Sequence, residues 1–320
     1  MRTLLDVKNL SIDYKTSKGI VNAIKDVTFT IREKEIFALV GESGCGKSTI
    51  AFALMRLLSK NGSIANGSIV FNGKEVIRMT EKEMADFRGK EIGMIFQNPM
   101  DSLNPVMTVG KQVLESILID KIPKQVAWEK VIKIFEDVRI PDARERIKSY
   151  PFELSGGMRQ RAMISMMISR KPTLLIADEP TTALDVTIQA QILKVIKRLK
   201  DEFKTSVLLI THDFGVVAET ADRIGVMYAG NLVEMGSLED IFNRASHPYT
   251  KLLMKALPTI SKKEGRLVTI PGMVPNLINL PEGCRFSNRC PNKMDICSTA
   301  TPRLKEYTDG HYCACHLLEV

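Results

Sequence analysis

The stretch GESGCGKS, residues 41–48, decides the fold of this chain. It follows the apolar run EIFALV (residues 35–40), which is typical of a strand buried on both faces, and it leads into STIAFALMRLL (residues 48–58), an apolar helical pattern. Its glycines let the backbone curl so that N–H groups point inward at a phosphate, and the helix N-terminus adds positive potential. The stretch fits G-x-x-x-x-G-K-[ST] and therefore predicts a phosphate-binding P-loop.

Two residues of this loop have specific predicted roles. Lys47 should reach the β and γ phosphates of a nucleotide, and Ser48 should hold magnesium. Cys45 occupies a free position of the motif and is interpreted as a small, tolerated residue. The predicted nucleotide-binding residues of the loop are Gly41, Glu42, Ser43, Gly44, Cys45, Gly46, Lys47, Ser48 and Thr49.

The rest of the chain alternates between strand and helix patterns. Residues 4–31 alternate apolar and polar positions, which predicts antiparallel sheet, and Asn-Gly pairs at 66–67 and 72–73 suggest hairpin turns. Residues 106–149 are mostly helical in periodicity. TLLIAD (173–178) and SVLLIT (206–211) predict buried strands with an amphipathic helix between them, which implies a parallel sheet. The predicted fold class is α/β.

The length and composition of the chain indicate how many cores it forms and in which compartment it works. The chain has 320 residues, 44% of them hydrophobic and 26% charged, which predicts one large core plus something smaller. No run of eighteen apolar residues and no hydrophobic signal-peptide core is visible, so we expect a soluble, cytoplasmic protein. The net charge of +8 suits an anionic ligand, nucleic acid or a lipid surface, or a generally basic solvated surface.

Two further motifs point to phosphate chemistry. LLIADEP ends a predicted strand with Asp178, which should face magnesium, and Glu179, which can orient an attacking water. LSGGMRQR (154–161) precedes an apolar helix, and its Ser155, Gly156 and Gly157 can present backbone donors and a helix N-terminus to phosphate. The chain thus contains two predicted phosphate-binding helix starts.

The P-loop, LSGGMRQR, LLIADEP and THD, in this order, resemble the nucleotide-binding domain of ATP-binding cassette (ABC) proteins. The resemblance covers roughly residues 4–257. It implies an ABC domain over residues 1–257 with a RecA-like core, an antiparallel β subdomain and a helical signature subdomain at about 98–165. It also implies a head-to-tail dimer, in which each ATP is held between the P-loop of one subunit and the signature motif of the other.

The same resemblance implies roles for four other residues. Gln97 in IFQNP matches the Q-loop, which senses the γ-phosphate, contributes to the magnesium site and responds to the membrane subunit. Asp185 in TTALD matches the D-loop, and His212 in ITHD matches the switch histidine that contacts the γ-phosphate. Tyr14 stands where an aromatic residue stacks on adenine, with a core aromatic of a strand as the alternative. ATP and Mg²⁺ are the implied substrate and cofactor, and Glu179, His212 and Gln97 are the implied catalytic residues.

Two functional classes share this ATPase: transporter subunits, and soluble ATPases of DNA repair or translation. Repair ATPases carry long coiled-coil arms and translation factors carry two cassettes, whereas this chain has one cassette and no extended heptads. The transporter class is therefore favoured, with no nucleic-acid partner. Because the chain has no membrane helices of its own, two separate permease subunits are expected, and the chain should sit peripherally on the cytoplasmic face of the membrane.

The C-terminal part of the sequence indicates the class of transported substrate. HPYTKLLMKALP, PGMVPNL and the cysteine-rich stretch after them resemble the C-terminal extension of oligopeptide and dipeptide importer ATPases, here residues 258–320. The resemblance implies a peptide importer, with a related solute such as nickel as the alternative. It further implies a second, homologous ATPase subunit, or an identical copy, and an extracytoplasmic solute-binding protein.

Five of the six cysteines lie in this tail. A structural disulfide set is not expected in a cytosolic protein, so a metal is the better explanation, and the spacing alone indicates only a soft-metal site. The family's extension carries a [4Fe–4S] cluster in some members, and the resemblance matches its ligands to Cys284, Cys290, Cys297 and Cys315. Cys313 is then surplus. Zinc and unligated thiols are the alternatives.

Overall fold

The computed structural model describes residues 2–182, 185–257, 269–278 and 280–318, and its contacts divide the chain into two compact units. The first unit comprises Met1–Arg32, Ile36–Arg78 and Ile210–Val320, and the second comprises Glu33–Glu35 and Met79–Leu209. Each unit has its own secondary structure and its own buried side chains.

The first unit contains two sheets and several short helices. Its elements are β1 (Thr3–Thr16), β2 (Gly19–Arg32), β3 (Ile36–Val40), α1 (Lys47–Leu54), β4 (Gly62–Phe71), β5 (Lys74–Glu75), η1 (Val76–Arg78), α9 (Phe214–Thr220), β9 (Arg223–Tyr228), β10 (Asn231–Ser237), α10 (Leu238–Asn243), α11 (Pro248–Lys255), α13 (Ile296–Thr299), β11 (Lys305–Thr308), β12 (His311–Cys313) and η3 (His316–Leu318).

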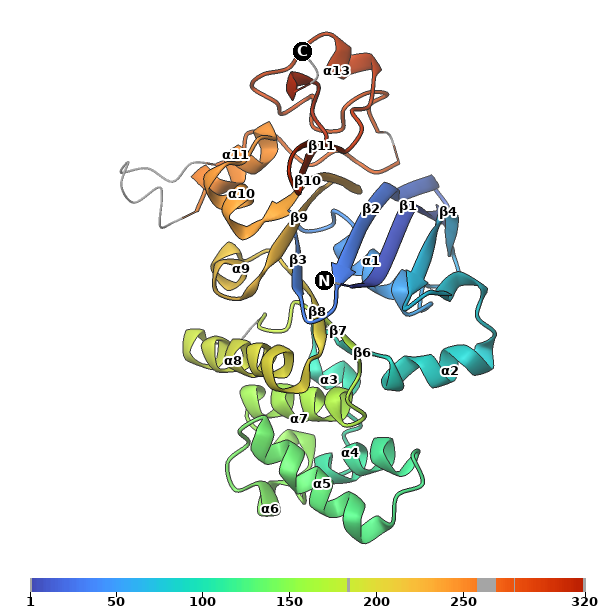
Figure 1. Ribbon diagram of the computed structural model, residues 1–320, viewed down its shortest axis with the longest axis vertical. Coiled ribbons are helices and arrows are strands. Elements are labelled where there is room, and N and C mark those ends of the chain that lie inside the picture. The colour runs from blue at the N-terminus through green and yellow to red at the C-terminus, as the bar shows by residue number, and fades with distance from the viewer. Residues whose placement is uncertain (1, 183–184, 258–268, 279, 319–320) are drawn as a thin grey trace. The chain divides into compact units, whose positions relative to one another are not determined.

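The opening strands form an antiparallel sheet in the order β2-β1-β4-β5, as the alternation of residues 4–31 predicts (Figure 1). Val7, Ile12 and Phe29 from its strands are almost completely buried. Apolar side chains at alternate positions give such a sheet one face that can pack against a core.

The two Asn-Gly pairs differ in outcome. Asn72-Gly73 turns the chain between β4 and β5, and both residues have positive φ, as a tight hairpin turn requires. Asn66-Gly67 lies inside β4, where the register with β1 shifts, so the prediction of a hairpin turn there was wrong. A Cβ at Gly67 would stand 2.6 Å from the carbonyl oxygen of Asn9. The glycine therefore permits an irregularity in a continuous strand.

Strand β3 is buried along its whole length, as its continuous apolar sequence predicts. It pairs in parallel with β9, and β9 pairs with β10 in antiparallel fashion. The P-loop follows the last residue of β3 and leads directly into α1.

The second unit is mainly helical. Its elements are α2 (Glu81–Lys90), β6 (Ile92–Ile95), α3 (Pro99–Ser102), α4 (Val109–Leu118), α5 (Lys124–Asp137), α6 (Ala143–Arg146), η2 (Pro151–Glu153), α7 (Gly156–Ile168), β7 (Leu174–Asp178), α8 (Val186–Phe203) and the first residues of β8 (Ser206–Thr211).

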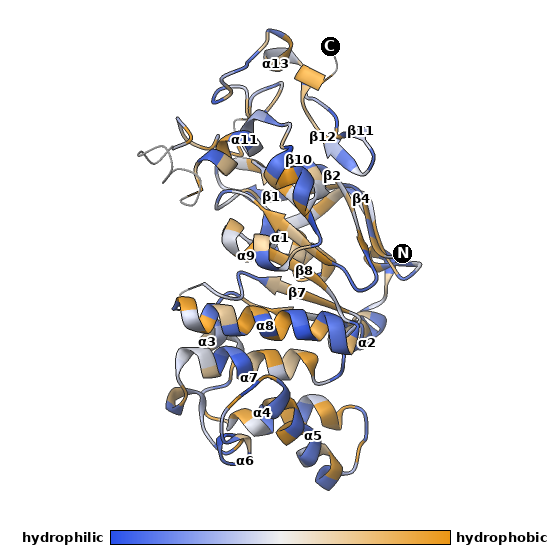
Figure 2. Cartoon of the chain, turned by 60° about the vertical axis from the view of Figure 1, so that its left-hand side comes forward, coloured by the Kyte–Doolittle hydropathy of each residue, from blue (hydrophilic) through white to orange (hydrophobic). Residues whose placement is uncertain are grey.

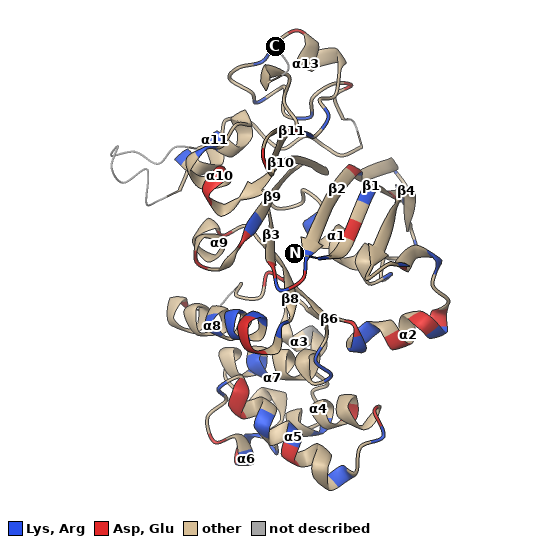
Figure 3. Ribbon diagram, in the orientation of Figure 1, with Lys and Arg blue, Asp and Glu red and all other residues tan. Residues whose placement is uncertain are grey.

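Strands β6 and β7 of this unit pair in parallel. Helix α8 is amphipathic: hydrophobic and hydrophilic residues alternate along it in Figure 2, and its apolar side includes the buried Ile192, Ile196 and Leu199. Acidic and basic residues mark α2 and α5 in Figure 3. Helices with one apolar side are expected where a helix packs on a core and faces water on its other side.

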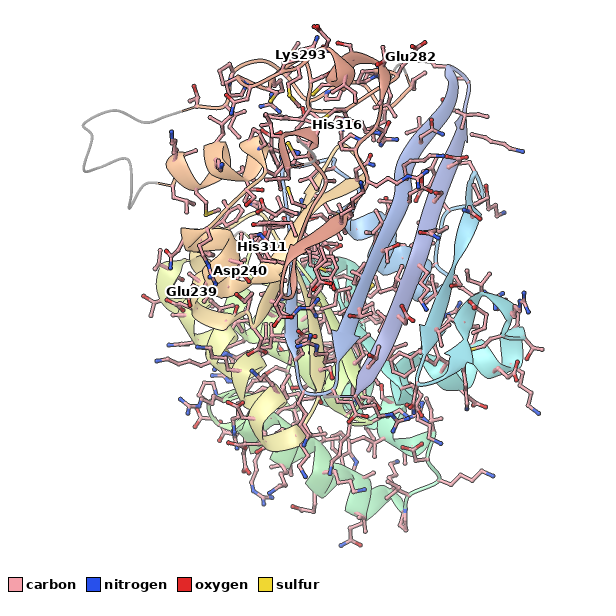
Figure 4. All side chains as sticks on the ribbon, turned by 45° about the horizontal axis from the view of Figure 1, so that its top comes forward. Glu239, Asp240, Glu282, Lys293, His311 and His316 are labelled. Atoms are coloured by element: carbon pink, nitrogen blue, oxygen red, sulfur yellow. The ribbon has the colours of Figure 1, made fainter. Side chains whose placement is uncertain are left out.

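The described residues 269–278 and 280–318, called the C-terminal segment below, belong to the first unit, and their strand β12 pairs with β10. At this junction His311 Nε2 lies 2.8 Å from a carboxylate oxygen of the fully buried Glu234. Figure 4 places His311 beside Asp240, and His311 Nδ1 lies 3.9 Å from Asp240 Oδ1. A buried polar cluster of this kind fixes how the C-terminal segment docks on β10.

No helix within the described parts of the chain combines the length and the apolar character needed to cross a bilayer. The predicted start of the C-terminal extension at residue 258 lies outside the described residues. The domain limits 1–257 and 258–320, and the helical subdomain at about 98–165, stay predictions.

Candidate nucleotide site and cysteine cluster

The P-loop has the backbone shape that its glycines predict. Gly41 has a φ of 150° and Gly46 has a φ of 100°, in the region that side chains rarely adopt. A Cβ at Gly41 would stand 2.2 Å from the carbonyl oxygen of Met227, and one at Gly46 would stand 2.8 Å from that of Ala23. Only glycine fits at either position, because both the backbone angle and the neighbouring backbone exclude a side chain.

Lys47 begins α1 and folds back over the loop. Its ammonium group donates to the carbonyl oxygens of Gly41 at 2.9 Å and Glu42 at 3.2 Å, and the side chain is buried. Gly46, the N-cap residue of α1, provides no side-chain cap. The helix start therefore combines a positive charge, main-chain N–H groups and the positive end of the helix dipole, which together suit a phosphate.

The other loop residues lie around this helix start. Ser43 and Gly44 are exposed at the tip, and Ser48 and Thr49 are half-buried in the first turn of α1. Cys45 is buried, and burial raises the pKa of its thiol despite the nearby Lys47. A buried thiol of raised pKa is unreactive at neutral pH, which agrees with the interpretation of Cys45 as a tolerated small residue.

The end of β7 in the second unit brings Glu179 and Gln97 together. The amide Nε2 of Gln97 donates to Glu179 Oε2 at 2.8 Å, and the hydroxyl of Thr182 donates to the same oxygen at 3.0 Å. Glu179 has a φ of 46°, an uncommon value for a residue with a side chain, whereas the preceding Asp178 is buried at the end of the strand. Backbone strain of this kind concentrates at functional sites, and here it accompanies a carboxylate held by two donors.

The signature stretch begins α7 in the same unit. Ser155 is the N-cap residue, and its hydroxyl accepts from the backbone N–H of Met158 at 3.4 Å. A Cβ at Gly157 would stand 2.6 Å from Ile188 Cγ2 on α8, so this glycine lets the two helices approach closely. Ser155 and Gly156 are exposed, which leaves this helix start accessible to a ligand.

The three remaining predicted site residues, Asp185, His212 and Tyr14, lie at the start of a helix, after a strand and within a strand. Asp185 is the N-cap residue of α8, where its carboxylate accepts from the backbone N–H of Ile188 at 2.9 Å. His212 is exposed directly after β8. Tyr14 is half-buried on β1, and its ring lies against Gly62, where a Cβ would come within 2.6 Å of the ring.

Sequence reasoning missed several polar residues that support these positions. Gln160 of α7 is buried and donates to the carbonyl oxygen of Pro180, next to Glu179, at 2.8 Å. Thr182 holds Glu179, and Arg289 of the C-terminal segment forms an ion pair with Glu42 of the P-loop. Gln160 and Thr182 lie inside or beside the motifs and could have been suspected, but nothing in the sequence pairs Arg289 with Glu42.

The prediction of an iron–sulfur cluster, and of metal binding by the tail, was wrong. Cys284, Cys290, Cys297 and Cys315 do line one small cavity, but the described residues contain no group of three or more His, Cys, Asp or Glu side chains placed to hold a metal ion. Burial raises the pKa of Cys284 to about 11 and also raises the pKa values of Cys290 and Cys315. Zinc, the alternative, has no support either, because no group of described side chains is placed to hold it.

The cysteines are also not paired with one another. All six, including Cys313, are free. The backbone N–H of Cys284 donates to the carbonyl oxygen of Cys297 at 2.9 Å, which ties two parts of the C-terminal segment together. The cysteines of the C-terminal segment therefore contribute to its packing.

Comparison with known proteins supports the resemblance of the ATPase part of the chain and that of its C-terminal part. Residues 24–182 match the family described as "ABC transporter", and residues 233–297 match "Oligopeptide/dipeptide transporter, C-terminal region". The chain is 48% identical to the oligopeptide transport ATP-binding protein OppD of Salmonella typhimurium, over 98% of this chain and 93% of that protein. It is 46% identical to the dipeptide transport ATP-binding protein DppD of Bacillus subtilis, over 99% and 95%.

The fold also matches solved structures. The dimeric ATP-binding cassette MJ0796, in a post-hydrolysis state with ADP and Pi, superposes with a TM-score of 0.67 at 25% identity, covering 73% of this chain and 99% of that one. The predicted α/β fold of ABC type is thereby confirmed, and the similarity to two ATP-binding proteins over nearly the whole chain agrees with it. The chain therefore belongs to the family of ABC transporter ATP-binding proteins, in the group that carries the oligopeptide/dipeptide transporter C-terminal region.

Proposed function

We propose that this ATPase energises the import of oligopeptides or dipeptides across a membrane. The observation that carries the proposal is the near full-length similarity to OppD and DppD, which includes the C-terminal region and not only the ATPase domain. A relationship confined to residues 24–182 would support ATP hydrolysis alone, since that part of the fold serves many kinds of transporter.

Nucleotide binding is assigned to the first unit. Lys47 and the N–H groups at the start of α1 would bind the β and γ phosphates, and Ser48 would contribute to the magnesium site. Tyr14 would stack on adenine, and His212 would contact the γ-phosphate. Support comes from the buried Lys47 ammonium above the loop and from the uncapped helix start, both of which suit a phosphate.

Hydrolysis is assigned to the second unit. Asp178 would hold magnesium, which neutralises charge on the phosphates when it is bound, and Gln97 would contribute to that site. Glu179 would orient the attacking water and accept its proton. Support comes from the hydrogen bonds of Gln97 and Thr182 to Glu179 Oε2, which fix the orientation of the carboxylate.

The working assembly would contain two cassettes arranged head to tail. Ser155, Gly156 and Gly157 of one subunit would face the ATP on the P-loop of the other, with Asp185 at the contact. The second cassette would be a homologous subunit, with an identical copy as the alternative. Two permeases would anchor the pair at the cytoplasmic face of the membrane, and an extracytoplasmic solute-binding protein would deliver the peptide.

A reconstituted system tests the substrate class. The chain should hydrolyse ATP weakly when purified alone, and faster in liposomes with its permeases, its partner ATPase and a binding protein loaded with a peptide. The same liposomes with the unloaded binding protein, and with nickel in place of peptide, are the controls. Stimulation by nickel but not by any peptide would refute the peptide assignment, and full activity of a monomeric preparation would refute the shared site.

A further inference from the structure

Arg289 of the C-terminal segment lies against the P-loop. Its guanidinium donates two hydrogen bonds to the Glu42 carboxylate, from Nη1 to Oε2 at 2.7 Å and from Nη2 to Oε1 at 3.1 Å. The Arg289 side chain is 5% exposed and that of Glu42 is 27% exposed. A two-pronged, largely buried pair of this kind is stronger and more directional than an ion pair on the surface.

The guanidinium is itself held in place from several sides. Its Nε donates to the carbonyl oxygen of Pro271 at 2.8 Å, its Nη1 lies 3.3 Å from the hydroxyl of Tyr228, and its centre lies 5.7 Å from the Tyr228 ring. The hydrogen bonds to Glu42 raise the pKa of Arg289 above its ordinary value. Arg289 is therefore a fixed, permanently charged group beside the loop.

Glu42 is the second residue of the P-loop, and its backbone also belongs to the phosphate-binding arrangement. Its carbonyl oxygen accepts from the Lys47 ammonium at 3.2 Å, and its N–H donates to the hydroxyl of the buried Tyr249 at 3.2 Å. The ring of Phe286, from the C-terminal segment, packs against Tyr249 with centroids 5.4 Å apart. The first turn of the P-loop thus rests on side chains from the far end of the sequence.

A second arginine of the segment reaches the same neighbourhood. Arg285 donates to the carbonyl oxygen of Ala229, and the next residue, Gly230, donates its N–H to the carbonyl oxygen of Cys45 at 3.0 Å. The C-terminal segment therefore supports the loop at Glu42 and, through the turn after β9, at Cys45.

The ion pair between Arg289 and Glu42 bears on nucleotide binding through the charge of the Glu42 carboxylate. A carboxylate on the second residue of a phosphate-binding loop repels the polyphosphate of ATP unless a cation neutralises it. The Lys47 ammonium donates to loop carbonyl oxygens, whereas Arg289 bonds directly to the carboxylate. Among the described contacts of the Glu42 carboxylate, those from Arg289 supply the neutralising charge.

We propose that Arg289 is a positioning residue of the nucleotide site, which neutralises Glu42 and holds the first turn of the P-loop in the shape that receives the phosphates. The proposal rests on the assignment of nucleotide binding to this P-loop. It makes the C-terminal segment a working part of the ATPase: any change that moves this segment would also change the affinity for nucleotide.

The test is a double-mutant cycle on the full-length chain, with the dissociation constant of a fluorescent ATP analogue in excess Mg²⁺ as the readout. Arg289→Gln should weaken binding about tenfold, because the carboxylate of Glu42 is then left uncompensated beside the phosphate-binding loop. The double variant Glu42→Gln/Arg289→Gln should recover most of that loss and bind within about threefold of the unaltered chain, because it removes the repelling carboxylate together with its partner. Arg303→Gln, on an exposed arginine of the same segment, is the matched control and should bind as the unaltered chain does.

Other outcomes separate the explanations. A double variant that binds as weakly as Arg289→Gln alone, or no loss of affinity in Arg289→Gln, would overturn the proposal, even if thermal unfolding showed that Arg289 stabilises the fold. If Arg289→Gln does not fold, Arg289→Lys decides, because lysine keeps the charge but cannot make both bonds. It should weaken binding about threefold when Glu42 is present and leave it unchanged in the Glu42→Gln background, and unchanged binding in both would overturn the proposal. Failure of the unaltered chain to bind nucleotide would instead refute the P-loop assignment itself.

Discussion

The P-loop of the first unit and the residues around β7 and α7 of the second unit are built by different means. In the P-loop, main-chain groups and glycines make the shape, and Lys47 bonds to main-chain carbonyls. In the second unit, side chains make the contacts: Gln97 and Thr182 donate hydrogen bonds to Glu179, and Ser155 caps α7. Binding should therefore be sensitive to backbone shape, and hydrolysis to the chemistry of single side-chain atoms.

The largest expected effect is that of Glu179→Gln. The amide keeps the size of the side chain and a hydrogen bond to Thr182, but it cannot accept a proton from water. The ATPase rate of the assembled transporter should fall by about 10²- to 10⁴-fold, while binding of Mg-ATP is retained. Glu219→Gln, on an exposed glutamate of α9, is the control and should leave both unchanged. A variant that turns over at a near-normal rate would remove Glu179 from the mechanism.

The next effect tests whether binding depends on backbone shape. Gly46→Ala places a Cβ 2.8 Å from the carbonyl oxygen of Ala23 and 2.5 Å from Ile24 Cδ1, at a φ of 100°. We expect about 10- to 100-fold weaker binding of ATP, measured by fluorescence titration, because the loop must shift to relieve the contact.

Gly44→Ala is the matched control for this prediction. Gly44 also has a positive φ, of 78°, but a Cβ there would meet nothing within 4 Å. In Gly44→Ala the free energy of ATP binding should therefore fall only by the smaller cost of placing a side chain in the left-handed region, on the order of 1 kcal/mol. Equal losses at both glycines would mean that backbone strain, and not the contact behind Gly46, sets the affinity.

These two regions also show what sequence reasoning could reach. The P-loop is contiguous, so the spacing of its residues fixes their geometry, and the same holds for Asp178 and Glu179 at the end of one strand. The pairing of Arg289 with Glu42 joins residues far apart in the sequence, and no local pattern encodes it. The metal prediction for the cysteines was wrong for a related reason: their spacing could not show how the fold places the side chains, and among the described residues no group is placed to hold a metal ion.

Local signals failed once within the sheet as well. Asn66-Gly67 and Asn72-Gly73 are the same dipeptide, yet only the second forms a turn. Pairing of β4 with the long strand β1 on both sides of Asn66-Gly67 stabilises a continuous strand, and this outweighs the turn propensity of the pair.

A moderate effect is expected at Gly157 in the signature stretch. Gly157→Ala would bring a Cβ to 2.6 Å from Ile188 Cγ2, the end of a side chain that can move, and its φ is not strained. The free energy of unfolding should fall by about 1 to 2 kcal/mol, as for other overpacked contacts. Ile188→Ala in the same chain should restore most of it, because it removes the opposing methyl group. A loss that the second substitution leaves unchanged would show that Gly157 is required for a reason other than this helix contact.

The smallest effect on stability, and the most informative about the shared site, is expected at Ser155. Its hydroxyl caps α7 through one long hydrogen bond of 3.4 Å, so Ser155→Ala should lower the free energy of unfolding by only about 0.5 kcal/mol. Ser155→Asp keeps an N-cap acceptor and adds a negative charge that favours a helix N-terminus, so it should be at least as stable as the unaltered chain. If α7 faces the ATP of a partner subunit, however, that charge repels the phosphates, and the assembled ATPase should fall well below that of Ser155→Ala. Stability and activity would then change in opposite directions. If the two changed together, Ser155 would be a helix cap alone, and the signature helix would have to bind phosphate through its backbone or not at all.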